Sequence, residues 1–227
     1  MTRVHRRDAI ALFAVLCFAA TSREAAAQNA LESGRLEISG GAAWLGAQTF
    51  GSANATETTP SGGAFSLFTT SSELGGAAAF DARVGVRIAG TLVVEADATY
   101  ARPELRVAIA NDVESGPSIT AVERLQQYMI GGGATWYVPG RSRIVPFVTG
   151  GGGYLRQLHD RALLVETGTY YQVGGGVLYL LSSHQDKRLK ATGVRGDVRA
   201  VIFNDGAAFD GGRHAAPAVA GSFFVRF

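Results

Sequence analysis

Apolar and polar residues alternate with a period of two along most of the chain, which is the pattern of half-buried β-strands. The clearest example lies within residues 72–89, where Phe80 and Val84 share one face and Arg83 lies on the opposite face. After a tight turn, the alternation resumes through residues 92–100. Because a shift of one residue would exchange the two faces, the register of such strands is strongly specified. The two segments predict a long hairpin with charged side chains on one shared face.

Six further segments carry the same alternation, so the sequence predicts eight strands. They lie within residues 36–44, 127–138, 146–156, 171–179, 194–202 and 219–227, and the Gly-rich run in 146–156 leaves the phase of that strand open. The connections are alternately long, at about 46–71, 102–121, 157–167 and 204–215, and short, at about 89–91, 139–145 and 182–188. Long loops on one rim and short turns on the other are typical of bacterial outer-membrane barrels. The first long connection is rich in Ser, Thr and Gly, which predicts an exposed, mobile loop.

The first 27 residues have the features of a secretory signal peptide. A basic region at 3–7, an apolar run of 12 residues at 9–20 and an Ala-Ala-Ala cleavage site at 25–27 follow one another. The apolar run is too short to span a bilayer as a helix. We therefore expect a signal peptide over 1–27, a short segment over 28–34 and one barrel domain over 35–227.

The composition of the exported part excludes several classes of protein. Four of the 21 Lys and Arg residues and two of the 19 Asp and Glu residues lie in 1–27, which leaves 17 of each sign and a formally neutral chain. Such a chain is not a generic nucleic-acid binder. The only cysteine, Cys17, lies in the signal segment, so a disulfide, a thiol nucleophile and a Cys-ligated metal are excluded for the rest. All 30 glycines remain, and so much glycine suits a lipid-facing sheet better than a water-soluble core.

Charges of both signs interleave on the polar face, which places that face inside a closed barrel. A sheet that spans lipid must close, because hydrocarbon offers no partner for an open edge. Eight strands enclose an interior that side chains just fill, which favours a salt-bridged plug over a gated path for ions or solutes. We expect the lumen ionic network to consist of Asp81, Arg83, Arg87, Glu95, Asp97, Glu123, Arg195, Asp197 and Arg199.

Aromatic residues stand near the predicted strand ends, as in the interfacial girdles of membrane barrels. We expect one rim to carry Trp44, Tyr100, Tyr154, Tyr171 and Phe203, and the other rim to carry Trp136, Tyr179, Phe223 and Phe227. Gly and Ala are spread over the apolar face, where they would fill a soluble core poorly. The apolar face is therefore predicted to look outward at lipid.

Segments near the end of the chain resemble a known family. The ending Val219-x-Gly221-x-Phe223-x-Val225-x-Phe227 resembles the C-terminal signal that the barrel assembly machinery reads, with Phe223, Val225 and Phe227 as its residues. Residues 146–154 and 193–199 resemble the fifth and seventh strands of the outer-membrane β-barrel domain family, which includes the outer-membrane protein A type transmembrane domain. The resemblance implies a fold, an outer-membrane location and the assembly machinery as a partner, and it implies little about activity.

The histidines give only a weak signal of chemistry. His159, His184 and His214 fall in different connections, with His184 on the opposite rim, so neither a metal site nor a catalytic triad is expected. A lipid A-modifying hydrolase or acyltransferase would need His214 with Ser118, or His159 with Asp160, and no His-x-Ser sequence lies on one strand.

The glycine runs at 131–133, 150–153 and 174–176 could suggest a phosphate-binding loop. They lack a following Lys-Ser or Lys-Thr and a helix, both of which that loop requires. We interpret them as room for strand coiling, for close approach of neighbouring strands and for larger lumen side chains.

The sequence thus predicts an all-β chain, an eight-stranded antiparallel up-and-down transmembrane β-barrel in a Gram-negative-type outer membrane, with the short turns in the periplasm. We expect a non-enzymatic monomer without cofactor or metal, surrounded by outer-membrane lipid, with a structural or surface-interaction role. The alternatives are a small channel or binding barrel for small or hydrophobic solutes, a lipid A-modifying enzyme, and a soluble secreted barrel with inverted facing. The facing of Arg83 and Arg199 decides between the membrane barrel and the soluble one.

Overall fold

The chain folds into antiparallel β-strands in the computed structural model, which describes residues 34–111, 117–139, 143–159, 164–184, 188–206 and 212–227. The strands are β1 (Leu36–Leu45), β2 (Gln48–Thr58), β3 (Ala64–Leu74), β4 (Ala77–Ala89), β5 (Leu92–Ala101), β6 (Glu104–Ala110), β7 (Ile119–Tyr137), β8 (Ile144–His159), β9 (Val165–Ser183), β10 (Ala191–Asp205) and β11 (Arg213–Arg226). The signal peptide predicted over 1–27 lies outside the described residues. Within these ranges, a search for helices of sufficient length and hydropathy to cross a bilayer finds none.

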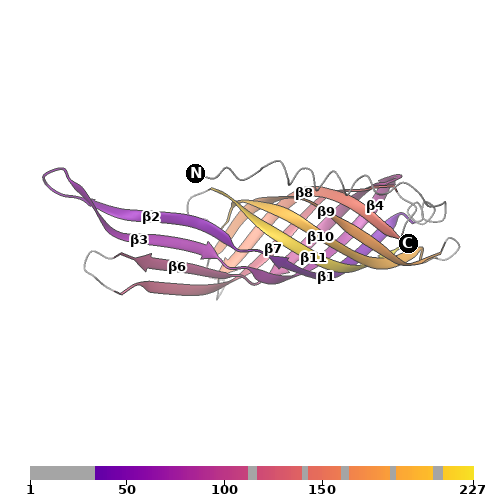
Figure 1. Cartoon of the computed structure of the whole chain (residues 1–227), viewed down its shortest axis with the longest axis horizontal. Helices are drawn as coiled ribbons and strands as arrows, with labels where there is room; N and C mark the ends of the chain where they lie inside the picture. The colour runs from indigo at the N-terminus through magenta and orange to yellow at the C-terminus, as the bar shows by residue number, and fades with distance from the viewer. Residues whose placement is uncertain (1–33, 112–116, 140–142, 160–163, 185–187, 207–211) are drawn as a thin grey trace, which may run out of the picture.

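Eight of these strands close into a ring (Figure 1). β1 pairs with β4 on one side and with β11 on the other, and the ring continues from β4 through β5, β7, β8, β9 and β10 to β11. The first and last strands close the barrel through pairs such as Ile38 with Val225. Every pairing around the ring is antiparallel, so the predicted eight-stranded antiparallel barrel is confirmed.

Side chains alternate between the two faces of the ring wall as the sequence predicts. On β10, Val198 is 58% exposed, whereas the neighbouring Arg199 is 5% exposed and lies inside. On β4, Val84 is exposed and Arg83 is buried. An inverted soluble barrel would need the reverse facing, so that alternative is excluded.

The phase of β8, which the sequence left open, is now fixed. Phe147 and Leu155 are buried inside the ring, and Val148 and Tyr154 are exposed on its outer surface. The glycines between them are all half-buried, but the odd-numbered residues on both sides of the run face inward, so the phase of the strand is unchanged across it.

Three strands that the sequence did not predict extend the wall beyond the ring (Figure 1). β2 pairs with β3, β3 with β6, and β6 with residues 119–124 of β7, so a four-stranded raised sheet stands on the rim opposite the short turns. β2 and β3 occupy the connection 46–71, and β6 occupies part of 102–121. The prediction of loops there was wrong, because small polar residues such as Thr and Ser on water-facing strands give no apolar alternation to detect.

The outer face of the raised sheet is polar. The Thr69 hydroxyl donates to Oδ1 of Asn54 at 2.9 Å. Arg106 lies 3.5 Å from Glu73 and 3.4 Å from Glu104 in exposed ion pairs. At its base the inner face is apolar, where Phe50, Leu74, Leu105 and Leu125 form a buried cluster. The same strand faces therefore change chemistry between the ring and the raised sheet.

Candidate functional site

The inner face of the ring gathers seven of the nine charged residues predicted for the lumen. Asp81 and Arg83 lie on β4, Glu95 and Asp97 on β5, and Arg195, Asp197 and Arg199 on β10, and all seven are buried. They alternate with the exposed apolar residues of the same strands, so the strand period places all of them inside.

The ion pair between Arg195 and Glu95 crosses the interior of the barrel. Nη1 of Arg195 lies 2.8 Å from Oε1 of Glu95. The strands that carry them, β10 and β5, stand opposite each other in the ring of eight. The guanidinium group also lies over the ring of Phe147, 4.3 Å from its centroid. Because the pair joins opposite walls, its side chains fill the middle of the lumen.

A second group of ion pairs surrounds the carboxylates of Asp81 and Asp197. Asp81 accepts a hydrogen bond from Nη2 of Arg83 at 2.8 Å and lies 3.5 Å from Nη2 of Arg199. Asp197 lies 2.7 Å from Nε of Arg199 and 3.4 Å from Nη2 of Arg83. Asp197 also lies 3.5 Å from Nε of Arg195. Asp81 thus contacts two guanidinium groups and Asp197 three, which offsets the cost of removing these charges from water.

Asp97 is held by neutral donors. The hydroxyl of Tyr170 donates to its Oδ2 at 2.6 Å, and Nε2 of Gln172 donates to its Oδ1 at 3.3 Å. The side-chain oxygen of Gln172 in turn accepts a hydrogen bond from Arg199 at 2.9 Å. Asp97 therefore joins the other charges through an amide, a connection that a search for charged residues alone does not find.

The sequence analysis also missed the buried pair formed by Glu37 and Arg226. Nε of Arg226 donates to Oε2 of Glu37 at 3.0 Å, and the hydroxyl of Tyr137 donates to Oε1 of the same carboxylate at 3.1 Å. Both charged residues occupy polar positions of the first and last strands. Because a closed barrel makes those strands neighbours, the closure itself was the signal that could have identified the pair.

Apolar side chains close the charged interior at both ends. Near the short turns the buried cluster comprises Val93, Tyr137, Val145, Phe147, Leu178, Leu180, Ala191 and Phe224. Near the raised sheet it comprises Ala43, Leu45, Ala77, Ala79, Ala101, Met129, Leu155, Tyr170, Val201, Phe203, Ala216, Ala218 and Ala220. The charged residues occupy the middle of β4, β5 and β10. The main group of ion pairs therefore lies between two mostly apolar clusters, and the cluster near the short turns packs around the Glu37–Arg226 pair through Tyr137 and Phe224.

Three predicted site residues lie elsewhere. Arg87 lies at the short-turn end, where Nη1 donates to the carbonyl of Gly90 at 3.0 Å. Glu123 lies at the base of the raised sheet with a partly exposed side chain, 2.9 Å from Nδ1 of His159. Phe203 was predicted on a rim, but it is 2% exposed inside the ring, because it neighbours the outward-facing Ile202 on β10.

The remaining predicted rim aromatics lie on the outer surface. Trp44, Trp136, Tyr154, Tyr171, Tyr179, Phe223 and Phe227 are exposed to between 40% and 58%, and Tyr100 is half-buried against Tyr128. Within the predicted assembly signal, Phe223 and Phe227 face outward and Val225 is half-buried. The backbone N–H of Phe227 donates to the carbonyl of Leu36 at 2.8 Å, so the last residue is part of the barrel closure.

The three histidines have separate surroundings. His159 lies between Glu123 and Glu166, with Nε2 at 3.5 Å from the latter. Nδ1 of His214 lies 3.0 Å from the carbonyl oxygen of Thr49, and His184 lies 3.1 Å from the hydroxyl of Ser182. In the described part of the chain no three His, Cys, Asp or Glu side chains are grouped to hold a metal ion. Asp160, considered above as a partner of His159, lies outside the described residues.

Several inward-facing glycines stand where a side chain would collide with the neighbouring strand. A Cβ atom at Gly174 would lie 2.7 Å from Cγ of Arg199, and one at Gly176 would lie 2.8 Å from Cβ of Asp197. A Cβ atom at Gly133 would lie 2.9 Å from the Cα atom of Gly151. These contacts agree with the interpretation of the glycine runs as room for close strands and for lumen side chains.

Comparison with solved structures finds the same architecture. Neisserial surface protein A matches with a TM-score of 0.52 and 13% identity over 85% of this chain and 97% of its own. The fold is that of a small outer-membrane β-barrel. The outer membrane protein OprG from Pseudomonas aeruginosa is also found, with a TM-score of 0.49 and 13% identity over 86% of this chain and 96% of its own. Neither a family model nor a curated protein matches the chain.

Proposed function

We propose that this chain is an outer-membrane β-barrel with a closed interior, which displays the raised sheet outside the cell as an interaction surface. The observation that carries the proposal is the Arg195–Glu95 pair across the lumen, between two clusters of buried, mostly apolar side chains. A conducting pore needs a continuous hydrated path, and apolar constrictions block conduction by excluding water. A structural or surface-interaction role therefore fits the interior better than solute passage.

The outer surface of the ring supports a membrane location. It presents exposed Val, Ile, Phe and Leu side chains from every strand of the ring, among them Phe80, Val94 and Val219. Water-soluble monomers seldom expose continuous apolar surface of this extent. Exposed Trp and Tyr residues near the rims match the aromatic girdles of membrane barrels. Export would use the signal peptide predicted over 1–27.

The change of chemistry along the outer surface supports an orientation. The exposed ion pairs of Arg106 with Glu73 and Glu104 suit water, so the raised sheet would stand above the membrane. Short periplasmic turns and longer external segments are the rule for these barrels. With the short turns in the periplasm, β2 would project by roughly 36 Å if it ran straight, at about 3.3 Å per residue.

The same proposal covers assembly and partners. The outward-facing Phe223 and Phe227 on the last strand would be read by the barrel assembly machinery, and outer-membrane lipid would surround the ring. The protein would act as a monomer without cofactor, nucleic acid or enzymatic activity. Its extracellular ligand would contact the raised sheet, whose outer face is rich in hydroxyl, amide and charged groups.

Planar-bilayer recording on the purified, folded protein tests the closed interior. We expect no steady open level from the wild type, because the ion pairs and the two buried clusters fill the lumen. The double variant Glu95→Ala/Arg195→Ala removes the crossing pair and should conduct more often than the wild type. A single, steady open level from the wild type would instead establish the small-channel alternative.

Carbonate extraction of membranes from expressing cells tests the location separately. The chain should remain with the membrane pellet, since its apolar surface contacts lipid directly. Release into the soluble fraction would overturn the membrane assignment, whatever the conductance result. Lipid A mass spectra from the same cells should be unchanged by expression, and a new lipid A species would identify an enzyme.

A further inference from the structure

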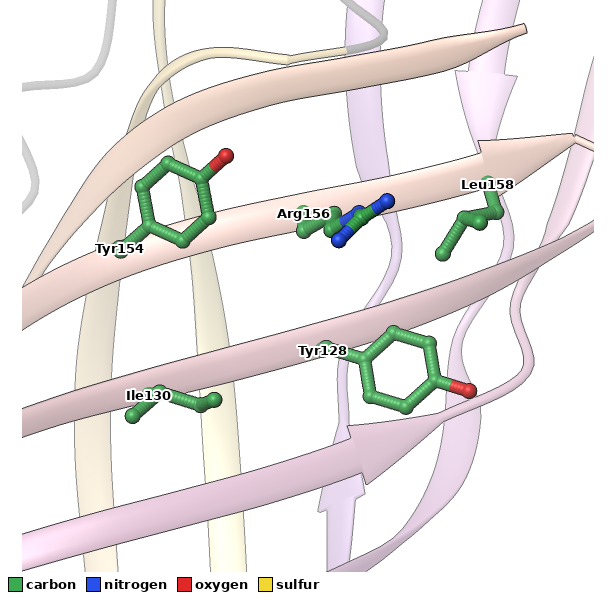
Figure 2. A pocket seen from close by; sticks show the side chains of 5 residues that line it. All are labelled: Tyr128, Ile130, Tyr154, Arg156 and Leu158. Carbon is green, nitrogen blue, oxygen red and sulfur yellow. The ribbon is translucent and has the colours of Figure 1, made fainter.

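The outer surface of β7 and β8 contains a groove just below the raised sheet (Figure 2). It has a volume of about 390 Å³ and is lined by Tyr128, Ile130, Tyr154, Arg156 and Leu158. Tyr128 is the direct cross-strand partner of Arg156, and Ile130 is the partner of Tyr154. The groove thus has an arginine row formed by Tyr128 and Arg156 and an apolar row formed by Ile130 and Tyr154, with Leu158 beside Arg156 on β8.

The groove lies where the outer surface changes from apolar to polar. At its lower end, Ile130 is 63% exposed and continues into the lipid-facing surface of the ring. Above it, β7 enters the raised sheet with the exposed Arg124, which is 3.7 Å from Glu104. This is the height at which lipid headgroups meet a membrane barrel, and tyrosines are enriched there.

Arg156 is exposed, and among the described residues it forms no ion pair with a carboxylate. The nearby outward-facing cations differ from it in this respect, because Arg106 and Arg124 contact Glu104, and Arg102 donates to the hydroxyl of Tyr100 at 2.6 Å. On the other side of Arg156, its cross-strand partner on β9 is the exposed Thr167. The Tyr128 hydroxyl donates to the side-chain oxygen of Gln126 at 3.2 Å, so the guanidinium of Arg156 and the hydroxyl of Thr167 are the donors left for a ligand. A planar guanidinium can give two parallel hydrogen bonds to one phosphate.

We propose that this groove binds an anionic glycolipid of the outer leaflet, with a phosphate held by Arg156 and an acyl chain lying along Ile130 and Tyr154. The proposal rests on the outer-membrane location proposed above. A free phosphate would use the arginine alone and would make no contact with the apolar row. A lipid uses both rows, because its charged and apolar parts are joined at the same height as they are in the groove.

Titration of lipid A into the folded wild-type protein in neutral detergent micelles tests the site, with retained lipid counted by native mass spectrometry. Arg156→Gln should weaken lipid A binding about tenfold, which is the effect expected for loss of charge-assisted hydrogen bonds to one phosphate. Arg124→Gln removes the same charge from a neighbouring outward position and should change binding less than twofold. Equal binding by wild type and Arg156→Gln would overturn the proposal.

A second measurement uses only the wild type, so it does not depend on the folding of a variant. Lipid A stripped of its phosphates should bind about tenfold more weakly than intact lipid A. Inorganic phosphate at the same concentration should not compete. Equal binding of the two lipids, or competition by inorganic phosphate, would contradict binding of the glycolipid through both its phosphate and its acyl chain. Failure here with normal carbonate resistance would remove the lipid site and leave the membrane barrel in place.

Discussion

The ring and the raised sheet share strands but have outer surfaces of opposite chemistry. β7 runs through both, and its outward side chains change from Ile130 and Trp136 in the ring to Arg124 in the raised sheet. Charged residues are buried inside the ring, and they are exposed on the outside of the raised sheet. One continuous β-structure therefore has an apolar outer surface suited to lipid in the ring and a polar outer surface suited to water in the raised sheet. The charged side chains point inward in the first region and outward in the second.

Removing one buried charge should have the largest effect on this arrangement. Asp197→Ala leaves Arg83, Arg195 and Arg199 short of a carboxylate inside the ring. We expect a loss of about 3–5 kcal/mol in the free energy of unfolding, the usual cost of an uncompensated buried charge. Urea unfolding in lipid vesicles, followed by the heat-dependent gel shift of the folded barrel, measures it. The control Val198→Ala, one residue away on the lipid face, should lose much less, and equal losses would contradict an internal network.

An arginine introduced on the outer surface distinguishes the two solvents. Val198→Arg places a charge against hydrocarbon and should destabilise the barrel by about 2–4 kcal/mol, whereas Val122→Arg in the raised sheet should cost about 0–1 kcal/mol. Both valines are more than half exposed, so packing differs little between the two sites. The same urea titration compares them. A similar cost at both positions would mean that they face the same solvent.

A methyl group added inside the ring should matter more than one added outside. Gly174→Ala would bring Cβ to 2.7 Å from Arg199 and into the neighbouring backbone, while a Cβ at Gly221 meets nothing within 4 Å. Overpacking of this kind costs about 1–3 kcal/mol, so Gly174→Ala should lower the unfolding midpoint and Gly221→Ala should leave it nearly unchanged. If the two variants have the same unfolding midpoint, the inward-facing glycines are not needed to make room for neighbouring strands and lumen side chains.

Charge removal on the raised sheet should have the smallest effect. Arg106→Ala breaks exposed pairs with Glu73 and Glu104, and such pairs contribute about 0–1 kcal/mol. The stability of the folded barrel should therefore be almost that of the wild type, with any difference decreasing as salt is added. A loss as large as that of Asp197→Ala would place these charges in a low-dielectric environment.

The ring was predictable from the sequence because its two faces meet different media. Alternation between residues such as Val84 and Arg83 has a period of two that only one strand register satisfies. The raised sheet was not predictable in the same way, because both of its faces meet water over much of its length and residues such as Thr69 and Ser71 carry little pattern. Its existence depends on pairing between β3 and β6, which are distant in sequence.

The sequence predicted which charged residues lie inside the ring better than it predicted which of them contact each other. The alternation placed Glu95 and Arg195 on the inner face, but their contact depends on which strands stand opposite each other in the closed ring. Phe203 shows the reverse error, since the alternation that turns Ile202 outward requires Phe203 to face inward. At this position the strand register outweighs the general preference of aromatic residues for the membrane interfaces.

The facing of adjacent residues on one strand tests the account most directly. Cys17 is the only cysteine and lies in the predicted signal peptide, so single-cysteine variants of the exported chain have no background thiol. Ala42 is exposed on the outer surface of β1, and Ala43 is 8% exposed inside it. In vesicles, a lipid-soluble maleimide should label Ala42→Cys rapidly and Ala43→Cys only after unfolding. Faster labelling of Ala43→Cys from the lipid would contradict the orientation on which the whole account depends.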